Sequence, residues 1–167
     1  MRSDDRKDAH TVLLSMRGNA PEIDRLKRVL PVIAQRDNPV IIQGHAEAVK
    51  ELFARTVHLS SHRSSRMFLV VESMANLNML GRDLESFFST WLRGGTLFLK
   101  RFCRLSGCRR KMVFDLAAKL DVRLLLSTWS VFEEMKKQRI TPDEILRLNP
   151  FLVSLNTEET KGRLPSI

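Results

Sequence analysis

The chain has 167 residues, of which 43% are hydrophobic and 28% charged, a composition that excludes wholesale disorder and fits one domain. Its 28 basic and 19 acidic residues give a net charge of +9, which favours an anionic partner. Two cysteines exclude a disulfide scaffold, and neither a secretion signal nor an apolar run of the ~18 residues that a membrane helix needs is present, so we expect a cytoplasmic protein with no membrane contact.

The predicted elements alternate between helices and short, apolar strands. In chain order we expect a helix opened by Asn19 and Pro21, a strand at 40–42, a helix at 48–57, a strand at 67–71, a helical stretch at 74–92 broken by Gly81, a strand at 96–99, a helix at 109–120, a strand at 122–126, short helices at 132–138 and 145–148, and a strand at 151–155. This alternation predicts an α/β protein with a parallel sheet. We expect a flexible segment at 1–17 and a loose tail at 157–167 around a core at 18–156.

Parallel sheets bind ligands beyond the carboxyl ends of their strands, often at a helix N-terminus. The first strand leads into Gly44–Arg55, a segment that resembles the phosphate loop of NtrC-type bacterial enhancer-binding proteins, the AAA+ activators of sigma-54 RNA polymerase. The matching residues are Gly44, Lys50, Glu51, Leu52, Ala54, Arg55 and His58. Three later segments match the same family in the same order: Gly94–Leu99, Val122–Leu124 with Thr128, and Asp143 with Arg147–Asn149.

This resemblance implies a three-layer αβα sandwich of the P-loop, AAA+ type, with a mainly parallel sheet of about five strands. The family's helical lid and its DNA-binding domain would follow Leu155, where too few residues remain, so we expect the lid to be absent. The family contacts sigma-54 through a G-A-F-T-G-A loop between strands two and three. Residues 72–94 contain no such motif.

The departures from the family pattern fall on the residues of the ATPase chemistry. Glu47 and Val49 stand at two glycine positions of the phosphate loop, where backbone N–H groups must approach phosphate closely. Lys100 and Arg101 stand at the acidic pair that holds Mg²⁺ and polarises the attacking water in the family. Because Mg²⁺ prefers carboxylate and phosphate oxygens, two cations there oppose metal binding.

Two further positions lack the family's catalytic groups. Trp129 stands at the sensor asparagine and Thr141 at the arginine finger, the loss of which costs about 10³–10⁵ in rate. We therefore predict no catalytic residue, no metal and no required cofactor, with ATP binding left open. The predicted role is that of a degenerate AAA+ domain that regulates transcription without hydrolysis, partnered by an intact sigma-54 activator or another protein.

Two alternatives remain open. In the first, Lys50, Lys100 and Arg101 converge on the phosphates of a nucleotide or other polyanion without Mg²⁺, at a site that also includes Gly44 and Glu51. In the second, a basic patch binds DNA, and its residues are Arg104, Arg109, Arg110 and Lys111. A solvated loop and helix start is the simpler interpretation of that patch, although the macrodipole disfavours cations at a helix N-terminus.

An amphipathic series precedes the third strand. Its apolar residues are Leu84, Phe87, Phe88, Trp91 and Leu92. Core packing is the default interpretation of such a series, and part of it could also form a partner face.

Overall fold

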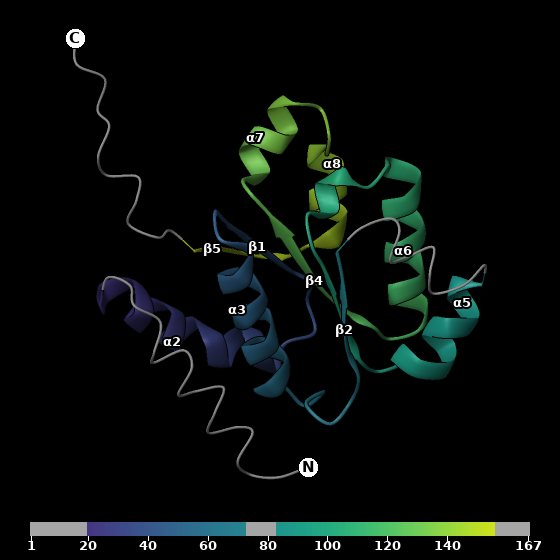
Figure 1. The fold of residues 1–167 in the computed structure, drawn as a ribbon, viewed down its shortest axis with the longest axis horizontal. Helices are drawn as coiled ribbons and strands as arrows, with labels where there is room; N and C mark the ends of the chain where they lie inside the picture. Colours follow the sequence, from purple (N-terminus) through teal and green to yellow (C-terminus); the bar gives the residue numbers. More distant parts are fainter. Residues whose placement is uncertain (1–19, 73–82, 156–167) are drawn as a thin grey trace.

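The computed structural model describes residues 20–72 and 83–155 (Figure 1). The predictions for the segments 1–17 and 157–167, and for the helical stretch from Met74 to Gly81, lie outside these ranges. The sheet contains β1 (Val40–Gly44), β2 (Phe68–Val71), β3 (Thr96–Leu99), β4 (Arg123–Thr128) and β5 (Phe151–Leu155). Its order is β2-β3-β4-β1-β5, and every pair is parallel. The predicted α/β class and the five-stranded sheet are confirmed.

Helices cover both faces of the sheet, which makes three layers (Figure 1). On one face lie α2 (Ala20–Gln35) and α3 (Glu47–Leu59). On the other lie α5 (Leu84–Phe87), the π-helical turn η1 (Phe88–Leu92) and α6 (Gly107–Lys119). The 3₁₀ turn η2 (Phe102–Arg104) follows β3, and the short helices α7 (Val131–Lys136) and α8 (Pro142–Leu148) connect β4 to β5.

Successive side chains along a strand point to opposite faces of the sheet, so each strand contributes to the hydrophobic core on both faces. In β3, Phe98 packs with α2 and α3, whereas Leu97 and Leu99 pack with α5, η1 and α6. All four residues of β3 and all six of β4 are buried. Burial on both faces explains the unbroken apolar stretches Leu97–Leu99 and Leu124–Leu126 in the sequence.

Two buried arginines hold the amino end of the sheet together. Arg63 donates to Asp37 Oδ1 at 2.9 Å and to Asp121 Oδ1 at 2.6 Å. Arg123 opens β4, is only 2% exposed, and donates to the carbonyl of Ile33 at 2.5 Å. That carbonyl lies in the last turn of α2 and also accepts from the Arg36 N–H at 3.3 Å, so Arg123 adds a side-chain donor at the end of this helix.

Some details of the helices differ from the sequence prediction. The helix predicted from Arg109 begins two residues earlier, because the Ser106 hydroxyl caps it by accepting from the Arg109 N–H at 3.4 Å. Met112, predicted on its apolar face, is exposed. In the amphipathic series Phe88 and Leu92 are fully buried, as the core interpretation predicts, whereas Trp91 is 61% exposed.

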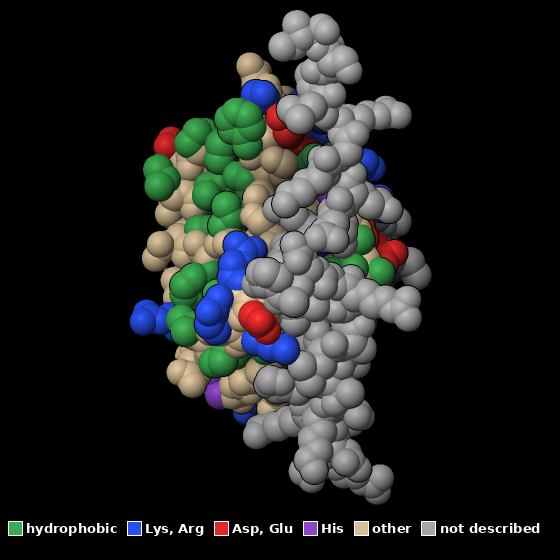
Figure 2. Space-filling view, turned by 90° about the vertical axis from the view of Figure 1, so that its left-hand side faces the viewer, with side chains coloured by type: hydrophobic (Ala, Val, Ile, Leu, Met, Phe, Trp, Pro, Cys, Tyr) green, Lys and Arg blue, Asp and Glu red, His purple; other side chains and the backbone are tan. Residues whose placement is uncertain are grey.

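The edge strand β5 borders an exposed face. Leu152 in its middle is 55% exposed. Figure 2 views the side of the molecule on which β5 and α2 lie, and it shows hydrophobic side chains together with Lys and Arg on the part that is coloured by residue type.

Within residues 20–72 and 83–155, no helix is long and apolar enough to span a membrane.

Candidate functional site

A pocket of about 590 Å³ lies at the carboxyl ends of β1 and β4 and beside the turn that follows β3. Its walls come from the β1–α3 loop, the end of β4, η2 and the segment around α7. This is where ligands bind in open parallel sheets. It is also the position at which the sequence predicted the phosphate loop, so it is the candidate site.

Gly44 allows the chain to leave β1 at this point. Its φ is +154°, and a Cβ added there would lie 2.4 Å from the carbonyl oxygen of Leu155. Its N–H donates to the Trp129 carbonyl at 3.1 Å. Glycine is therefore required by close backbone packing against β5, and no larger residue fits without a shift of β5.

Lys50 is a buried and fully partnered cation. It is 1% exposed. Its ammonium donates to the carbonyls of Gly44 at 2.8 Å and Thr128 at 2.9 Å, and it forms an ion pair with Glu47 Oε1 at 2.6 Å. An ammonium has three N–H donors, so these three acceptors use all of them.

Glu47 supplies this carboxylate from the first turn of α3. Its second oxygen accepts from the Ser127 hydroxyl at 3.0 Å. The partial positive charge of a helix N-terminus attracts anions. A side chain of the protein itself thus provides the negative charge beside Lys50 and the start of α3.

Lys100 is also held by carboxylates of the chain. Its Nζ lies 2.6 Å from Glu51 Oε2 and 2.6 Å from Glu72 Oε1. Burial opposes the charged ammonium, but the hydrogen bonds to Glu51 and Glu72 outweigh it and raise the pKa of Lys100. The hydrogen bond from Lys100, followed by that from Arg55, lowers the pKa of Glu51. Lys50 and Lys100, which were predicted to converge on an external phosphate, therefore both have carboxylate partners within the chain.

Arg101, the third cation of that prediction, is exposed and lines the pocket. Its backbone is left-handed, with φ +50°, and its N–H donates to the Ser127 hydroxyl at 3.0 Å. Beside it Trp129 is 55% exposed and makes an edge-to-face contact with His45, with 3.9 Å between ring centroids.

Burial raises the pKa of the Cys103 thiol to about 11, so this cysteine stays protonated and is not nucleophilic at neutral pH.

The predicted basic patch does not form one surface. Arg110 is 4% exposed, and its guanidinium donates to Glu144 Oε1 at 2.9 Å and to the Arg139 carbonyl at 2.7 Å. Lys111 pairs with Asp115 at 2.5 Å along α6, and Arg109 lies in the same helix. Arg104, in contrast, lines the candidate pocket. Arg110 is thus buried rather than exposed, and its hydrogen bonds tie α6 to α8.

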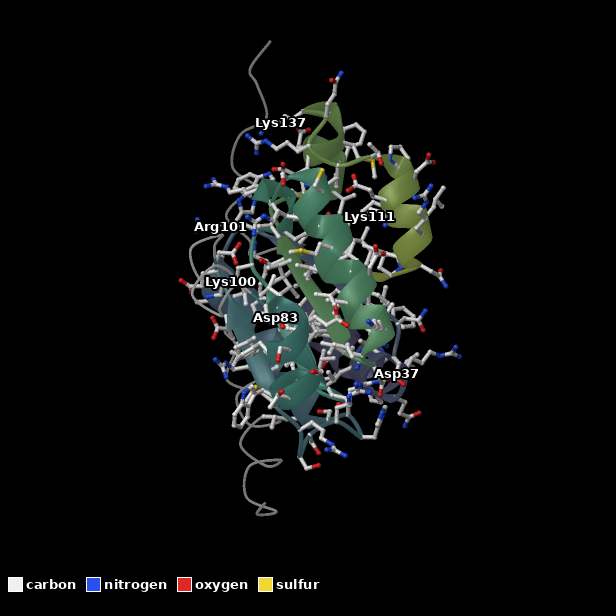
Figure 3. The ribbon with its side chains drawn as sticks, turned by 90° about the vertical axis from the view of Figure 1, so that its right-hand side faces the viewer. Asp37, Asp83, Lys100, Arg101, Lys111 and Lys137 are labelled. Atoms are coloured by element: carbon white, nitrogen blue, oxygen red, sulfur yellow. The ribbon has the colours of Figure 1, made fainter. Side chains whose placement is uncertain are left out.

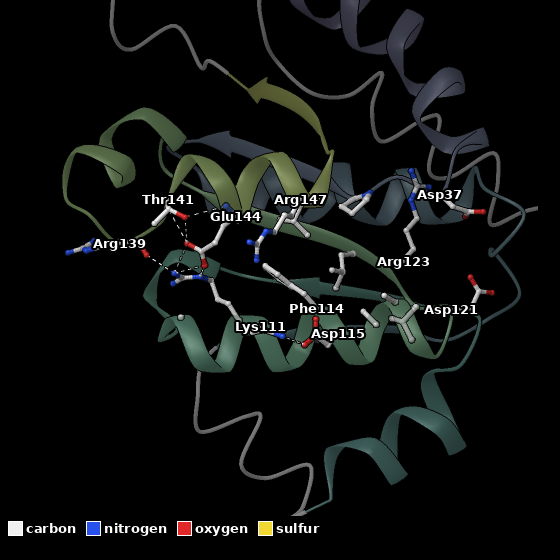
Figure 4. A pocket seen from close by; sticks show the side chains of 18 of the residues that line it. Asp37, Lys111, Phe114, Asp115, Asp121, Arg123, Arg139, Thr141, Glu144 and Arg147 are labelled. Carbon is white, nitrogen blue, oxygen red and sulfur yellow. Dashed lines mark hydrogen bonds and ion pairs between the residues drawn. The ribbon is translucent and has the colours of Figure 1, made fainter.

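A second and larger cavity, of about 860 Å³, was not predicted (Figure 4). It lies between α6 and α8 and reaches the amino end of β4. Phe114 and Leu148 contribute apolar walls, and charges of both signs surround them. Within the part of the chain that the structure describes, no group of three or more His, Cys, Asp or Glu is placed to hold a metal ion.

Sequence reasoning missed the contribution of the segment around α7 to the candidate pocket. Glu134, Lys137 and Arg139 line its outer side. One sequence feature pointed to this segment: α7 directly follows the carboxyl end of β4, where ligands bind. The spacing of its charges is ordinary for a solvated helix, however, and gave no reason to select them.

Comparison with known proteins finds one matching domain family and similar stretches in bacterial regulatory proteins. The sigma-54 interaction domain family matches residues 17–153. The transcriptional regulatory protein ZraR of Klebsiella oxytoca is 27% identical over 154 residues, which cover 83% of this chain and 31% of that protein. The regulator XylR of Pseudomonas putida is 26% identical over 167 residues, which cover 83% of this chain and 30% of that protein. The chain thus spans about a third of the length of these relatives.

Solved structures agree on the fold. NtrX from Brucella abortus in complex with ATP has a TM-score of 0.68 at 20% identity, covering 85% of this chain and 38% of that one. The P-loop NTPase domain of a sigma-54 activator from Escherichia coli has a TM-score of 0.61 at 19% identity, covering 77% of this chain and 98% of that one. These likenesses confirm the three-layer P-loop, AAA+ architecture predicted from the sequence.

Proposed function

The chain belongs to the sigma-54 interaction domain family, the AAA+ domains of transcription regulators, and from this premise we propose that it regulates transcription without hydrolysing ATP. The observation that supports this most strongly is the 2.6 Å ion pair between Glu47 and Lys50. The lysine that resembles the family's phosphate-binding lysine has no free donor, and one of its three acceptors is the carboxylate of Glu47.

The second support is the reversed charge after β3. Lys100 and Arg101 stand at the positions that resemble the family's magnesium-holding acidic pair, and Lys100 is bound to Glu51 and Glu72. A triphosphate with Mg²⁺ would have to displace these internal ion pairs. The proposed domain therefore keeps the fold of an AAA+ ATPase and lacks its chemistry.

The proposed partner is an intact AAA+ activator of sigma-54 RNA polymerase. AAA+ subunits bind nucleotide where neighbouring subunits meet, and the position that resembles the arginine finger is Thr141 in this chain. Thr141 instead caps α8, because its hydroxyl accepts from the Glu144 N–H at 3.2 Å. A subunit of this kind, inserted beside an active one, would offer no finger to its neighbour's nucleotide and would lower the neighbour's turnover.

A phosphate-release assay tests the first part of the proposal. The purified chain with ATP and Mg²⁺ is expected to release no phosphate above the buffer rate, with an intact sigma-54 activator as the positive control. Turnover typical of AAA+ ATPases would overturn it.

Mixing the chain with the intact activator tests the second part. We expect the activator's ATPase rate to fall as the chain is added. Thr141→Arg is expected to relieve this inhibition, whereas Thr141→Ala, which loses the same helix cap without adding a guanidinium, is expected to inhibit like the native chain. No change of rate on mixing, or equal behaviour of the two variants, would contradict the proposed partnership.

A further inference from the structure

The candidate pocket carries an excess of positive charge that its internal ion pairs leave unused. Its lining includes five Lys or Arg side chains and two Glu side chains. Both carboxylates are engaged, Glu47 with Lys50 at 2.6 Å and Glu134 with Arg139 at 3.1 Å. Three cations remain, and they are Arg101, Arg104 and Lys137.

These three cations come from separate elements and face solvent. Arg101 precedes η2, Arg104 ends it, and Lys137 follows α7. All three are exposed, and their side chains make no hydrogen bond or ion pair with any residue in 20–72 or 83–155. Figure 3 shows Arg101 and Lys137 toward the same edge of the molecule, apart from Lys111. They form a cationic rim around one opening.

An exposed aromatic face lies within this rim. Trp129 is 55% exposed, and His45 holds one edge of its ring at a centroid distance of 3.9 Å. Indole rings offer a flat surface on which nucleobases stack without regard to sequence. A fixed aromatic platform flanked by unpaired Lys and Arg is the combination that binds single-stranded nucleic acid.

We propose that this rim, made of Trp129, Arg101, Arg104 and Lys137, binds single-stranded nucleic acid. A base stacks on Trp129, and neighbouring backbone phosphates contact the three cations. A strand fits better than a free triphosphate because the inner end of the pocket is filled by the Glu47–Lys50 pair, whereas the free charges are spread along its outer side. The inference rests on the proposed function only in that no triphosphate competes for the pocket.

Fluorescence anisotropy of a short fluorescein-labelled oligo(dT), without nucleotide, tests this proposal. Trp129→Ala is expected to weaken binding by roughly 5- to 150-fold, which corresponds to the stacking of one base. Trp91→Ala removes the other exposed tryptophan and is expected to bind like the native chain. In a Trp91→Phe background the remaining indole fluorescence should fall as oligo(dT) binds.

Salt dependence tests the cations separately. Neutralising Arg101, Arg104 or Lys137 to Gln should each reduce the slope of log affinity against log salt by about 0.7, the value for one phosphate contact on a single strand. Arg93→Gln, an exposed arginine before the amino end of β3, is the matched control and should leave the slope unchanged.

Absence of binding to oligo(dT), or binding that ignores Trp129 and salt, would overturn the inference. Equal binding of a duplex DNA or of polyglutamate would also overturn it, because the first needs no stacking platform and the second carries no bases. A negative oligo(dT) result would overturn the nucleic-acid proposal and would not change the phosphate-release result. The two proposals are therefore tested independently.

Discussion

The two ends of the sheet use internally paired cations in different ways. At the amino end, Arg63 and Arg123 bind carbonyls and carboxylates that hold α2, β4 and the following loops in place. At the carboxyl end, Lys50 and Lys100 stand at positions that resemble a nucleotide site, where both bind carboxylates and Lys50 also donates to two carbonyls. The first set serves the fold. The second set pairs with carboxylates that keep partial access to water, and its loss should therefore cost less stability.

The largest effect is expected at the amino end, from Arg123→Ala. The change leaves a cavity and removes the guanidinium that donates to the carbonyls of Ile33 and Ala34, so the free energy of unfolding should fall by about 3–5 kcal/mol. Urea unfolding measures it. Arg36→Ala, at an exposed arginine just after α2, should change stability by less than ~0.5 kcal/mol. Similar losses for both variants would break the comparison.

The next largest effect is a pH dependence that His58 creates. Burial lowers the pKa of His58 to about 4, and its Nδ1 lies 2.9 Å from the Thr96 hydroxyl. The unfolded chain, with an ordinary histidine pKa of about 6.5, binds the proton more readily. Stability is therefore fully present above pH ~6.5 and falls by roughly 3 kcal/mol as the pH drops toward 4.

Urea unfolding at a series of pH values measures this dependence. His58→Gln should flatten the curve between pH ~6.5 and 4, because glutamine does not titrate. A variant curve that stays parallel to the native one would show that other groups carry the dependence.

At the carboxyl end, Lys50→Met should have an intermediate effect. It leaves the carbonyls of Gly44 and Thr128 without a donor, at a cost of about 1–3 kcal/mol in unfolding free energy. Because Glu47 keeps contact with the Ser127 hydroxyl and partial access to water, its charge is not stranded. A loss as large as that of Arg123→Ala would place Lys50 with the fold-holding cations.

The smallest effect is expected from Lys100→Gln. Its two carboxylate partners, Glu51 and Glu72, are 23% and 65% exposed, and ion pairs of this kind contribute about 0–1 kcal/mol. Thermal unfolding at low and high salt measures the difference. A loss of several kcal/mol that persists at high salt would contradict the comparison.

The fold could be predicted from the sequence because its determinants are local. An apolar β-branched run such as Val40–Ile42 predicts a strand, and Thr141-Pro142 predicts a helix start, without knowledge of the rest of the chain. The outcome at the site depended on contacts between distant segments. Lys50 and Glu51 were predicted to face a ligand, but which carboxylates reach them follows from side-chain packing around β1, β3 and α3.

The basic patch shows the same limit. Arg110 meets Glu144, 34 residues away in sequence, and nothing in the Lys100–Lys111 run indicates that partner. In the cationic rim, residues far apart in sequence come together instead. Lys137 lies beside the same pocket as Arg101 and Arg104 because of where α7 packs, and the sequence did not indicate this. Charge counts along the chain give a net charge of +9 but could not show which cations are paired within the described residues.

Calorimetric titration of the native chain with ATP and Mg²⁺ tests the central claim most directly. In the proposed account the Glu47–Lys50 pair takes the place of a bound phosphate, so no heat of binding is expected from the native chain. Glu47→Gly combined with Val49→Gly frees Lys50 and restores the loop's two glycines, and it should gain a measurable heat. Magnesium-dependent binding of ATP by the native chain would contradict the account.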